Sequence, residues 1–210
     1  MKKRMVLLTA LLVAASVPFS FAQDADDGWV KIFNGKNLDG WKDNAPGDGG
    51  EFAVENGEIV GKGTKNHLFY REELKNFELK IDASINNKGN SGVYVKSPWV
   101  DKDWPTGGFE IQLNATHSDP VKTGSLYNII KLFESPVPED TWFTYHLIVK
   151  GDSLTVKVND KVLYTYVDPA AGTPETALKR ISQKGHIALQ QHDPGSHPKF
   201  KNVYLKKLSD

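Results

Sequence analysis

Apolar and β-branched residues occur along most of the chain in short runs of five to nine residues, which Gly, Asn, Asp and Pro separate. No long stretch repeats its apolar residues with the period of a helix. Many short runs with turn residues between them predict an all-β protein, either a two-sheet sandwich or a barrel. We predict strands at 77–85, 92–96, 109–113, 142–150, 154–158, 161–167, 186–191 and 200–205, with weaker strands at 29–33, 52–54 and 58–60.

Three residue pairs predict tight turns between neighbouring strands: Asn56-Gly57, Gly151-Asp152 and Asn159-Asp160. Gly, Asn and Asp tolerate the positive φ of hairpin turns, so we expect antiparallel sheets. Two longer segments, 97–107 and 168–184, are irregular, and only the second has a stretch, 175–181, that could form a short helix. Loops of that length often border a functional site.

The first 22 residues have the three parts of a secretory signal peptide. A basic start at residues 2–4 precedes a mostly apolar run over 5–15, and the small residues Ser20 and Ala22 stand where a signal peptidase reads its cleavage site. The apolar run is shorter than the roughly 20 residues that a membrane-spanning helix needs. We therefore predict a signal peptide over 1–22, no membrane anchor, and a periplasmic or secreted mature protein.

Removal of 22 of the 210 residues would leave 188, residues 23–210, a length that fits one domain with its own core. The whole chain carries 26 basic and 26 acidic residues, and loss of the three basic residues of the signal peptide would leave 23 against 26. A slightly acidic protein is a poor partner for nucleic acid or for an anionic membrane. The chain has no cysteine, so we expect neither a disulfide nor a lipid attached to a processing-site cysteine.

The strand 109–113 carries the most informative polar pattern. Side chains alternate along a strand, so its three apolar residues share one face, while Glu110, Gln112 and the following Asn114 share the other. One face then enters the core, and the other presents a carboxylate and two amides.

The strand 186–191 repeats this pattern. Its residues Ile187 and Leu189 point one way, and His186, Gln190 and the following His192 point the other. Two such strands predict a polar groove on one sheet. An ordinary half-solvated antiparallel sheet alternates in the same way, so a surface role for these polar residues stays open.

Each candidate residue has two interpretations. Glu110 is either a catalytic base or a surface charge, and His192 is either catalytic or a hydrogen-bonded structural residue. We expect such a structural role for four other histidines: His67, His117, His146 and His197. The segment 192–197 could hold a divalent metal ion, although its spacing matches no standard ligand pattern. The identity of any metal ligand is therefore unknown.

Other chemistries are excluded by missing motifs. The sequence has no thiol nucleophile, no Gly-x-Ser-x-Gly elbow, no phosphate loop and no dinucleotide fingerprint. Of the tryptophans, Trp29, Trp41 and Trp142 lie in or beside apolar strands, where we expect them to fill the core. Trp99 and Trp104 lie in the irregular segment instead, and they either form a platform for a sugar ring or pack under their own loop.

Six blocks follow one another in the order found in a known family: 28–41 (GWVKIFNGKNLDGW), 90–96 (NSGVYVK), 109–113 (FEIQL), 123–127 (TGSLY), 185–192 (GHIALQQH) and 200–208 (FKNVYLKKL). Together they span nearly the whole mature chain, and they resemble the bacterial 3-keto-disaccharide hydrolase domain family. The resemblance implies a concanavalin A-like jelly roll of two antiparallel sheets with a concave face. It also implies cleavage of glycosides whose glucose unit carries a ketone at carbon 3.

The chain departs from the family pattern at two positions. Lys96 stands where the family usually has arginine, and Asp193 follows His192 where the family usually has glycine. Lysine keeps the charge but lacks the planar fork of arginine. Asp193 adds a carboxylate beside His192.

A ketone at carbon 3 simplifies the chemistry that the resemblance implies, because it acidifies the hydrogen on carbon 2. A conventional glycosidase needs two flanking carboxylates, whereas elimination needs one base, one group that stabilises the enolate and one acid. Glu110 and His192 are the candidate base and acid, in either order, and Lys96 or a bound divalent ion would stabilise the enolate. The residues expected to bind the carbohydrate substrate are Tyr94, Lys96, Trp104, Gln112, Tyr127 and Gln190.

Two other kinds of protein fit the same fold. One is a non-catalytic carbohydrate-binding module, and the other is a structural domain of the cell envelope. Fold alone does not distinguish these from an enzyme. The sequence shows no second domain beside which a binding module would usually be found.

Overall fold

The computed structural model describes residues 27–169 and 180–210, and within them every regular element is a strand. The larger sheet holds eight strands: β1 (Trp29–Lys31), β3 (Gly50–Glu55), β4 (Glu58–Gly63), β6 (Phe77–Ser84), β9 (Phe143–Lys150), β10 (Ser153–Val158), β11 (Lys161–Val167) and β13 (Lys199–Lys207). The smaller sheet holds five: β2 (Trp41–Asp43), β5 (Asn66–Tyr70), β7 (Ser91–Ser97), β8 (Phe109–Leu113) and β12 (His186–Gln191).

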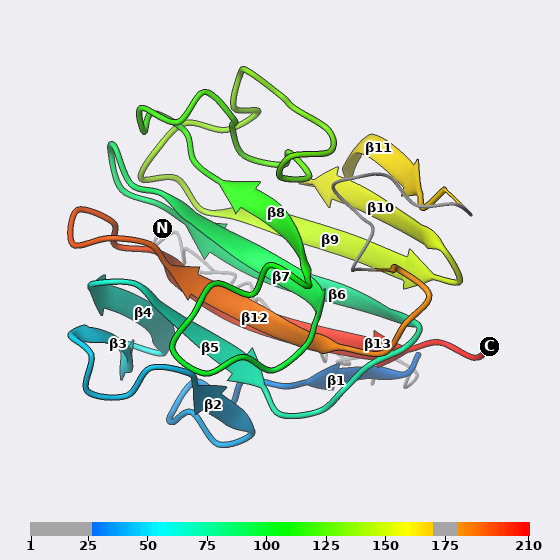
Figure 1. Ribbon diagram of the computed structural model, residues 1–210, viewed down its shortest axis with the longest axis horizontal. Coiled ribbons are helices and arrows are strands. Elements are labelled where there is room, and N and C mark those ends of the chain that lie inside the picture. Colours follow the sequence, from blue (N-terminus) through cyan, green and yellow to red (C-terminus); the bar gives the residue numbers. More distant parts are fainter. Residues whose placement is uncertain (1–26, 170–179) are drawn as a thin grey trace, which may run out of the picture.

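The two sheets are packed face to face, and all strand pairs are antiparallel (Figure 1). The larger sheet has the order β11-β10-β9-β6-β13-β4-β3, with β1 paired to β13, and the smaller sheet has the order β2-β5-β12-β7-β8. The first and last strands are therefore hydrogen-bonded neighbours, with Trp29 opposite Lys206. This architecture confirms the predicted all-β, two-sheet antiparallel jelly-roll sandwich of concanavalin A-like type.

The predicted turns connect strands as expected. Asn56 and Gly57 have φ values of 52° and 80° between β3 and β4, and Asn159 and Asp160 have φ values of 47° and 62° between β10 and β11. Gly151, with φ of 60°, turns the chain between β9 and β10. Only residues that tolerate the left-handed region fit these positions without strain.

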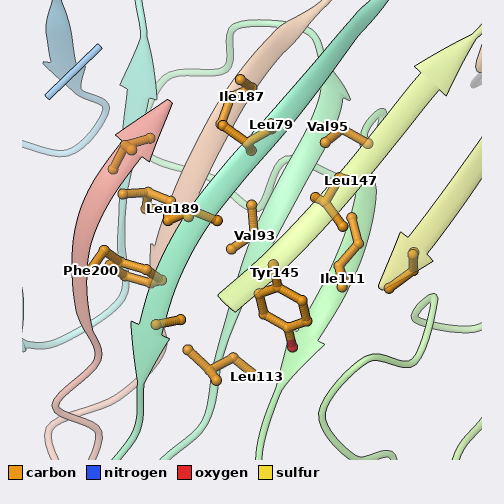
Figure 2. Packing of buried hydrophobic residues seen from close by; sticks show 14 of the residues in the cluster. Leu79, Val93, Val95, Ile111, Leu113, Tyr145, Leu147, Ile187, Leu189 and Phe200 are labelled. Atoms are coloured by element: carbon orange, nitrogen blue, oxygen red, sulfur yellow. The ribbon is translucent and has the colours of Figure 1, made fainter. Parts of the chain in front are cut away.

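The core lies between the sheets (Figure 2). Leu79 and Leu147 of the larger sheet and Val93, Ile111 and Leu189 of the smaller sheet are fully buried. Their alternation with polar residues fixes the orientation of β7, β8 and β12. The polar residues of these three strands are therefore directed to the opposite face of the smaller sheet.

Tyr145 adds a polar connection across this core. Its side chain is fully buried, and its hydroxyl donates to the carbonyl of Gln112 and accepts the N–H of Gly124 at 3.1 Å. A buried hydroxyl that bonds in both roles costs little free energy. It fixes the end of β8 and the segment after it relative to β9.

Several expectations differ from the structure. β2 and β5 were not predicted, and Trp29 and Trp142 lie half-buried with Lys80 and Lys201 over their rings, rather than in the core. Trp41 is buried as expected. The predicted signal peptide and most of the suggested helix over 175–181 lie outside the described residues. Among the residues that are described, none forms a helix with the length and apolarity that crossing a membrane requires.

Candidate active site

A pocket of about 540 Å³ opens on the face of the smaller sheet that points away from the core. Its volume lies in the range typical of small-molecule sites, about 300–1,000 Å³. The lining is mainly polar and aromatic, with one lysine: Asn90, Tyr94, Trp104, Thr106, Gly108, Glu110, Gln112, Asp119, Tyr127, Asn128, Lys131, Gln190 and His192. The structure thus brings together seven of the eight residues that we predicted for the site.

Strand register explains why these side chains meet. Tyr94 of β7 is opposite Glu110 of β8, and Gly92 is opposite Gln112. Residues directly opposite each other in antiparallel strands have neighbouring side chains on the same face. Gln190 of β12 lies close enough to bond to both Tyr94 and Glu110. Three strands thus each contribute a polar group to one patch.

The carboxylate of Glu110 is held by two donors. The hydroxyl of Tyr94 donates to Oε2 at 2.8 Å, and the amide of Gln190 donates to Oε1 at 3.0 Å. Burial, and then the negative charge of Glu110, hold the pKa of Tyr94 well above its ordinary value. Tyr94 therefore remains a hydroxyl and a donor at physiological pH. Both bonds fix the orientation of the Glu110 carboxylate.

Gly92 makes room for this carboxylate. A Cβ atom at position 92 would lie 2.5 Å from Oε1 of Glu110 and 2.8 Å from its Cγ. Such distances are far below van der Waals contact. The side chain of Glu110 can therefore lie across β7 only because residue 92 has no side chain.

His192 is paired with Asp193, the residue that departs from the family pattern. Nδ1 of His192 lies 2.7 Å from Oδ2 of Asp193. Burial alone would raise the pKa of Asp193, but bonds from His192, Ser196 and the N–H of Gly195 lower it below its ordinary value. An ionised carboxylate can only accept, so Nδ1 of His192 carries the proton. Nε2 is then the atom available for proton transfer.

Further hydrogen bonds support the pocket wall. The amide of Gln112 donates to Oδ1 of Asn90 at 2.7 Å, and the N–H of Asn90 donates to the Ser196 hydroxyl that also binds Asp193. The N–H of Tyr127 donates to the carbonyl of Glu110 at 2.9 Å, which fixes this residue beside β8. These bonds connect the surroundings of Glu110 with those of His192.

The two loop tryptophans have different positions. Trp104 lines the pocket, where its ring centroid lies 5.2 Å from that of His192. Trp99 is not part of the lining. Its ring packs on Phe69 at 4.9 Å, and Nζ of Lys42 lies 3.6 Å over it. Of the two candidate platforms, only Trp104 is in a position to contact a ligand in this pocket.

We predicted that Lys96 binds the substrate, but its side chain does not line the pocket. Lys96 has a left-handed backbone, with φ of 59°, next to an irregularity in the pairing of β7 and β12. This turn interrupts the alternation that would have directed the side chain into the pocket. Nζ of Lys96 donates instead to the carbonyls of Leu74 and Lys75, and burial, followed by the charge of Lys75, lowers its pKa to about 8.

Other polar candidates are structural. Asn114 is buried and binds the carbonyls of Asp119 and Val121, and His146 bonds to Glu78 at 2.7 Å. His67 differs from our expectation, because neither of its ring nitrogens has a hydrogen-bond partner within residues 27–169 and 180–210.

The donor groups do not form an evident metal site. Among the described residues, no group of three or more His, Asp or Glu side chains is arranged to hold a metal ion. In the segment 192–197, the carboxylate of Asp193 is already bonded to His192, Gly195 and Ser196. We therefore assign no step of the mechanism to a metal ion.

The sequence analysis missed six lining residues: Asn90, Thr106, Gly108, Asp119, Asn128 and Lys131. Asn90 lies in the block 90–96 of the family resemblance, and that block was the available indication of a role. Asp119 and Lys131 lie in the irregular stretch between β8 and β9, where no strand alternation assigns a face.

Comparisons with known proteins agree with this fold and pocket. A crystal structure of a Parabacteroides distasonis ATCC 8503 protein, provisionally described as a glycosyl hydrolase, has a TM-score of 0.75 at 27% identity and covers 87% of this chain and 94% of that one. A carbohydrate-binding module from Bacillus subtilis has a TM-score of 0.59 at 15% identity, over 80% of this chain and 96% of that one, and supports the fold alone. Fold and pocket together define a carbohydrate-active jelly-roll protein.

Sequence comparison identifies the family. The model of the 3-keto-alpha-glucoside-1,2-lyase-like domain matches residues 28–206. A 3-keto-disaccharide hydrolase of Bacteroides thetaiotaomicron is 33% identical over 87% of this chain and 79% of its own length. The chain belongs to the 3-keto-alpha-glucoside-1,2-lyase-like domain family, which confirms the resemblance seen in the six sequence blocks.

Proposed function

We propose that this protein cleaves glycosides whose glucose unit carries a ketone at carbon 3, by elimination followed by addition of water. The observation that carries the proposal is the oriented Glu110 carboxylate in the same pocket as the His192–Asp193 pair. Family membership and the name of the Bacteroides thetaiotaomicron relative support the substrate class.

Glu110 is the base in this proposal. Its carboxylate takes the proton from carbon 2, and the electron pair of that bond forms an enolate with the carbon 3 ketone. The enolate then re-forms the ketone, a double bond forms between carbons 1 and 2, and the bond from carbon 1 to the glycosidic oxygen breaks. His192, with a proton on each ring nitrogen, gives the leaving oxygen its proton from Nε2 and keeps the proton on Nδ1 that faces Asp193. Addition of water across the double bond yields the free 3-keto sugar.

The remaining lining residues have binding roles in this proposal. Lys131 replaces Lys96 as the cation for the enolate oxygen, because it is the one lysine or arginine in the described lining. Gln112, Gln190, Tyr94 and Tyr127 offer donors and acceptors to sugar hydroxyls, and the indole of Trp104 can stack on a sugar ring.

A turnover assay tests the proposal. We expect the purified protein to release the aglycone or second sugar from a 3-keto-glucoside, and to leave the corresponding glucoside without the ketone intact. The assay is run with and without a chelator to measure any metal requirement. Binding of the 3-keto-glucoside without turnover would contradict the proposal and favour a carbohydrate-binding module.

Replacement of Asp193 by asparagine tests the role of His192 as the general acid. We expect turnover to fall by about tenfold or more, because the carboxylate that bonds to a catalytic histidine sets its tautomer and orientation. Asparagine is nearly isosteric but can present its amide N–H to Nδ1, which would favour the wrong tautomer. Ser196→Ala is the control, because it removes one partner of Asp193 and leaves the carboxylate. An unchanged rate in Asp193→Asn would show that His192 does not depend on this pair.

We also propose that the protein is exported, on the evidence of the basic start, the apolar run and the small residues before position 23. N-terminal sequencing of the protein from a periplasmic or extracellular fraction should give Gln23 or a residue close to it. Recovery only of protein that still carries Met1 would contradict export with cleavage.

A further inference from the structure

His67 is a buried histidine at the border of the pocket. It lies in β5 opposite Gln190 of β12, which lines the pocket. Its ring stands edge-on to Tyr94 at 5.6 Å and to Trp104 at 5.4 Å, measured between ring centroids. His67 is therefore next to the carbohydrate pocket and separated from it by the indole of Trp104.

The ring of His67 has unused hydrogen-bonding capacity. The residue has an exposed fraction of 0%, and among the residues that the structure describes neither Nδ1 nor Nε2 has a hydrogen-bond partner. Burial, and then the charges of Lys65 and His192, lower its pKa to about 3. The imidazole is thus neutral at physiological pH, with one N–H donor and one acceptor. Buried polar atoms without partners are rare, because each has lost its bonds to water.

A second unused acceptor lies beside it. Oε1 of Gln190 is buried without a hydrogen-bond partner in the described part of the chain, while its amide nitrogen bonds to Tyr94 and Glu110. Because the amide nitrogen of Gln190 bonds to Glu110, the amide oxygen Oε1 faces away from Glu110. His67 and Gln190 together offer one donor and two acceptors, a set that matches sugar hydroxyls, since each hydroxyl can both donate and accept.

The indole of Trp104 covers His67 and is held in place by weak contacts. Trp104 belongs to the segment between β7 and β8, which lies across β12 and β5 in Figure 1. Among the described residues, the hydrogen bonds of Trp104 run through its backbone, to Asp103 and Thr106. Its indole is held by contacts with the rings of His67 and His192 and by Lys65, whose Nζ lies 5.3 Å from the ring centre. The indole can move aside without loss of a hydrogen bond.

We propose that His67 and Gln190 form a second sugar subsite, which Trp104 covers in the free protein and uncovers when a sugar ring binds. The incoming ring stacks on the displaced indole, and two of its hydroxyls bond to the imidazole, one as acceptor and one as donor. This subsite takes the sugar that extends from the residue held at Glu110, so it selects a disaccharide over a glucoside with a small aglycone. The proposal rests on the carbohydrate function proposed above.

Binding to a catalytically impaired protein tests the subsite. In a Glu110→Gln background, calorimetric titration with a 3-keto-disaccharide measures affinity without a need for turnover. We expect His67→Phe to weaken binding about tenfold or more, because phenylalanine fills the same space but has no nitrogen. The midpoint of thermal unfolding should be unchanged or higher, since two unpaired polar atoms are removed. His67→Gln keeps a donor and an acceptor, so it should restore part of the affinity. It replaces the phenylalanine variant as the test if that variant does not fold.

Intrinsic tryptophan fluorescence tests whether Trp104 moves away from His67 when the disaccharide binds. We expect the disaccharide to change tryptophan emission in the Glu110→Gln protein, and the change to be lost in Trp104→Phe and kept in the matched Trp99→Phe. Affinity within about twofold in folded His67→Phe, or a fluorescence change that persists in Trp104→Phe, would overturn the subsite alone. Absence of any binding to the Glu110→Gln parent, together with no turnover by the unmodified protein, would overturn the proposed function and the subsite with it.

Discussion

Replacement of Glu110 by glutamine should lower the turnover of a 3-keto-glucoside by about a hundredfold or more, the usual scale for loss of a positioned acid or base. The amide cannot take the proton from carbon 2. The fold should remain, because the two side chains are nearly isosteric and Glu110 lies on the pocket face of β8. The amide oxygen can still accept the bond from Tyr94, so the surrounding hydroxyl keeps a partner. Initial rates and a thermal unfolding curve of the two proteins measure both effects.

Glu51→Gln is the matched control. Glu51 is exposed on β3 of the other sheet, and the same chemical change there should leave the rate within experimental error. If Glu110→Gln and the unmodified protein have equal rates, Glu110 is not the base, and the jelly-roll fold is unaffected by that result. A loss of rate together with a much lower unfolding midpoint would indicate a structural role instead.

The strands that the sequence predicts well are those with one face in the core and one in a polar setting. The bounds of β8, β11 and β12 agree with the prediction to the residue. β5 was missed because it shows no alternation: four of its five residues are buried, and the loop tryptophans cover its outer face. β2 has only three residues, which is too short for a periodic pattern.

The same reasoning explains which site residues could be predicted. Strand alternation places Glu110, Gln112 and Gln190 on one face, and the structure brings them into one pocket. It fails at Lys96, where a left-handed residue interrupts the strand. His67 was beyond this reasoning, since its position depends on the pairing of β5 with β12 across more than a hundred residues of sequence.

The two outer tryptophans show a further limit of pattern reasoning. Trp29 lies in a strand and was expected in the core, yet it covers the outer face of the larger sheet beside His146 and Lys80. A large aromatic side chain can shield a sheet from solvent on either face, and β1 is too short to show which face is inner. Residue type alone did not determine burial there.

Gly92→Ala should lower turnover about tenfold to a hundredfold without unfolding the protein. The backbone of Gly92 is not in the left-handed region, so alanine can adopt it, and the obstacle is the carboxylate that a Cβ atom would meet at 2.5 Å. The far end of Glu110 can move away at little cost to the fold, but it then leaves its bonds with Tyr94 and Gln190. A displacement of about 1 Å can cost a factor of a hundred in rate. Rates and thermal unfolding of the variant measure the two effects separately.

A double-mutant cycle shows whether Gly92 acts through Glu110. Residues that act as one unit give non-additive losses, so Gly92→Ala should have little further effect in a protein that already carries Glu110→Gln. An equal loss in both backgrounds would mean that the added methyl group blocks the substrate instead of displacing the base. A single variant with a rate within about threefold of the parent would contradict the dependence of turnover on this carboxylate position, because the geometry leaves Glu110 no room to stay where it is.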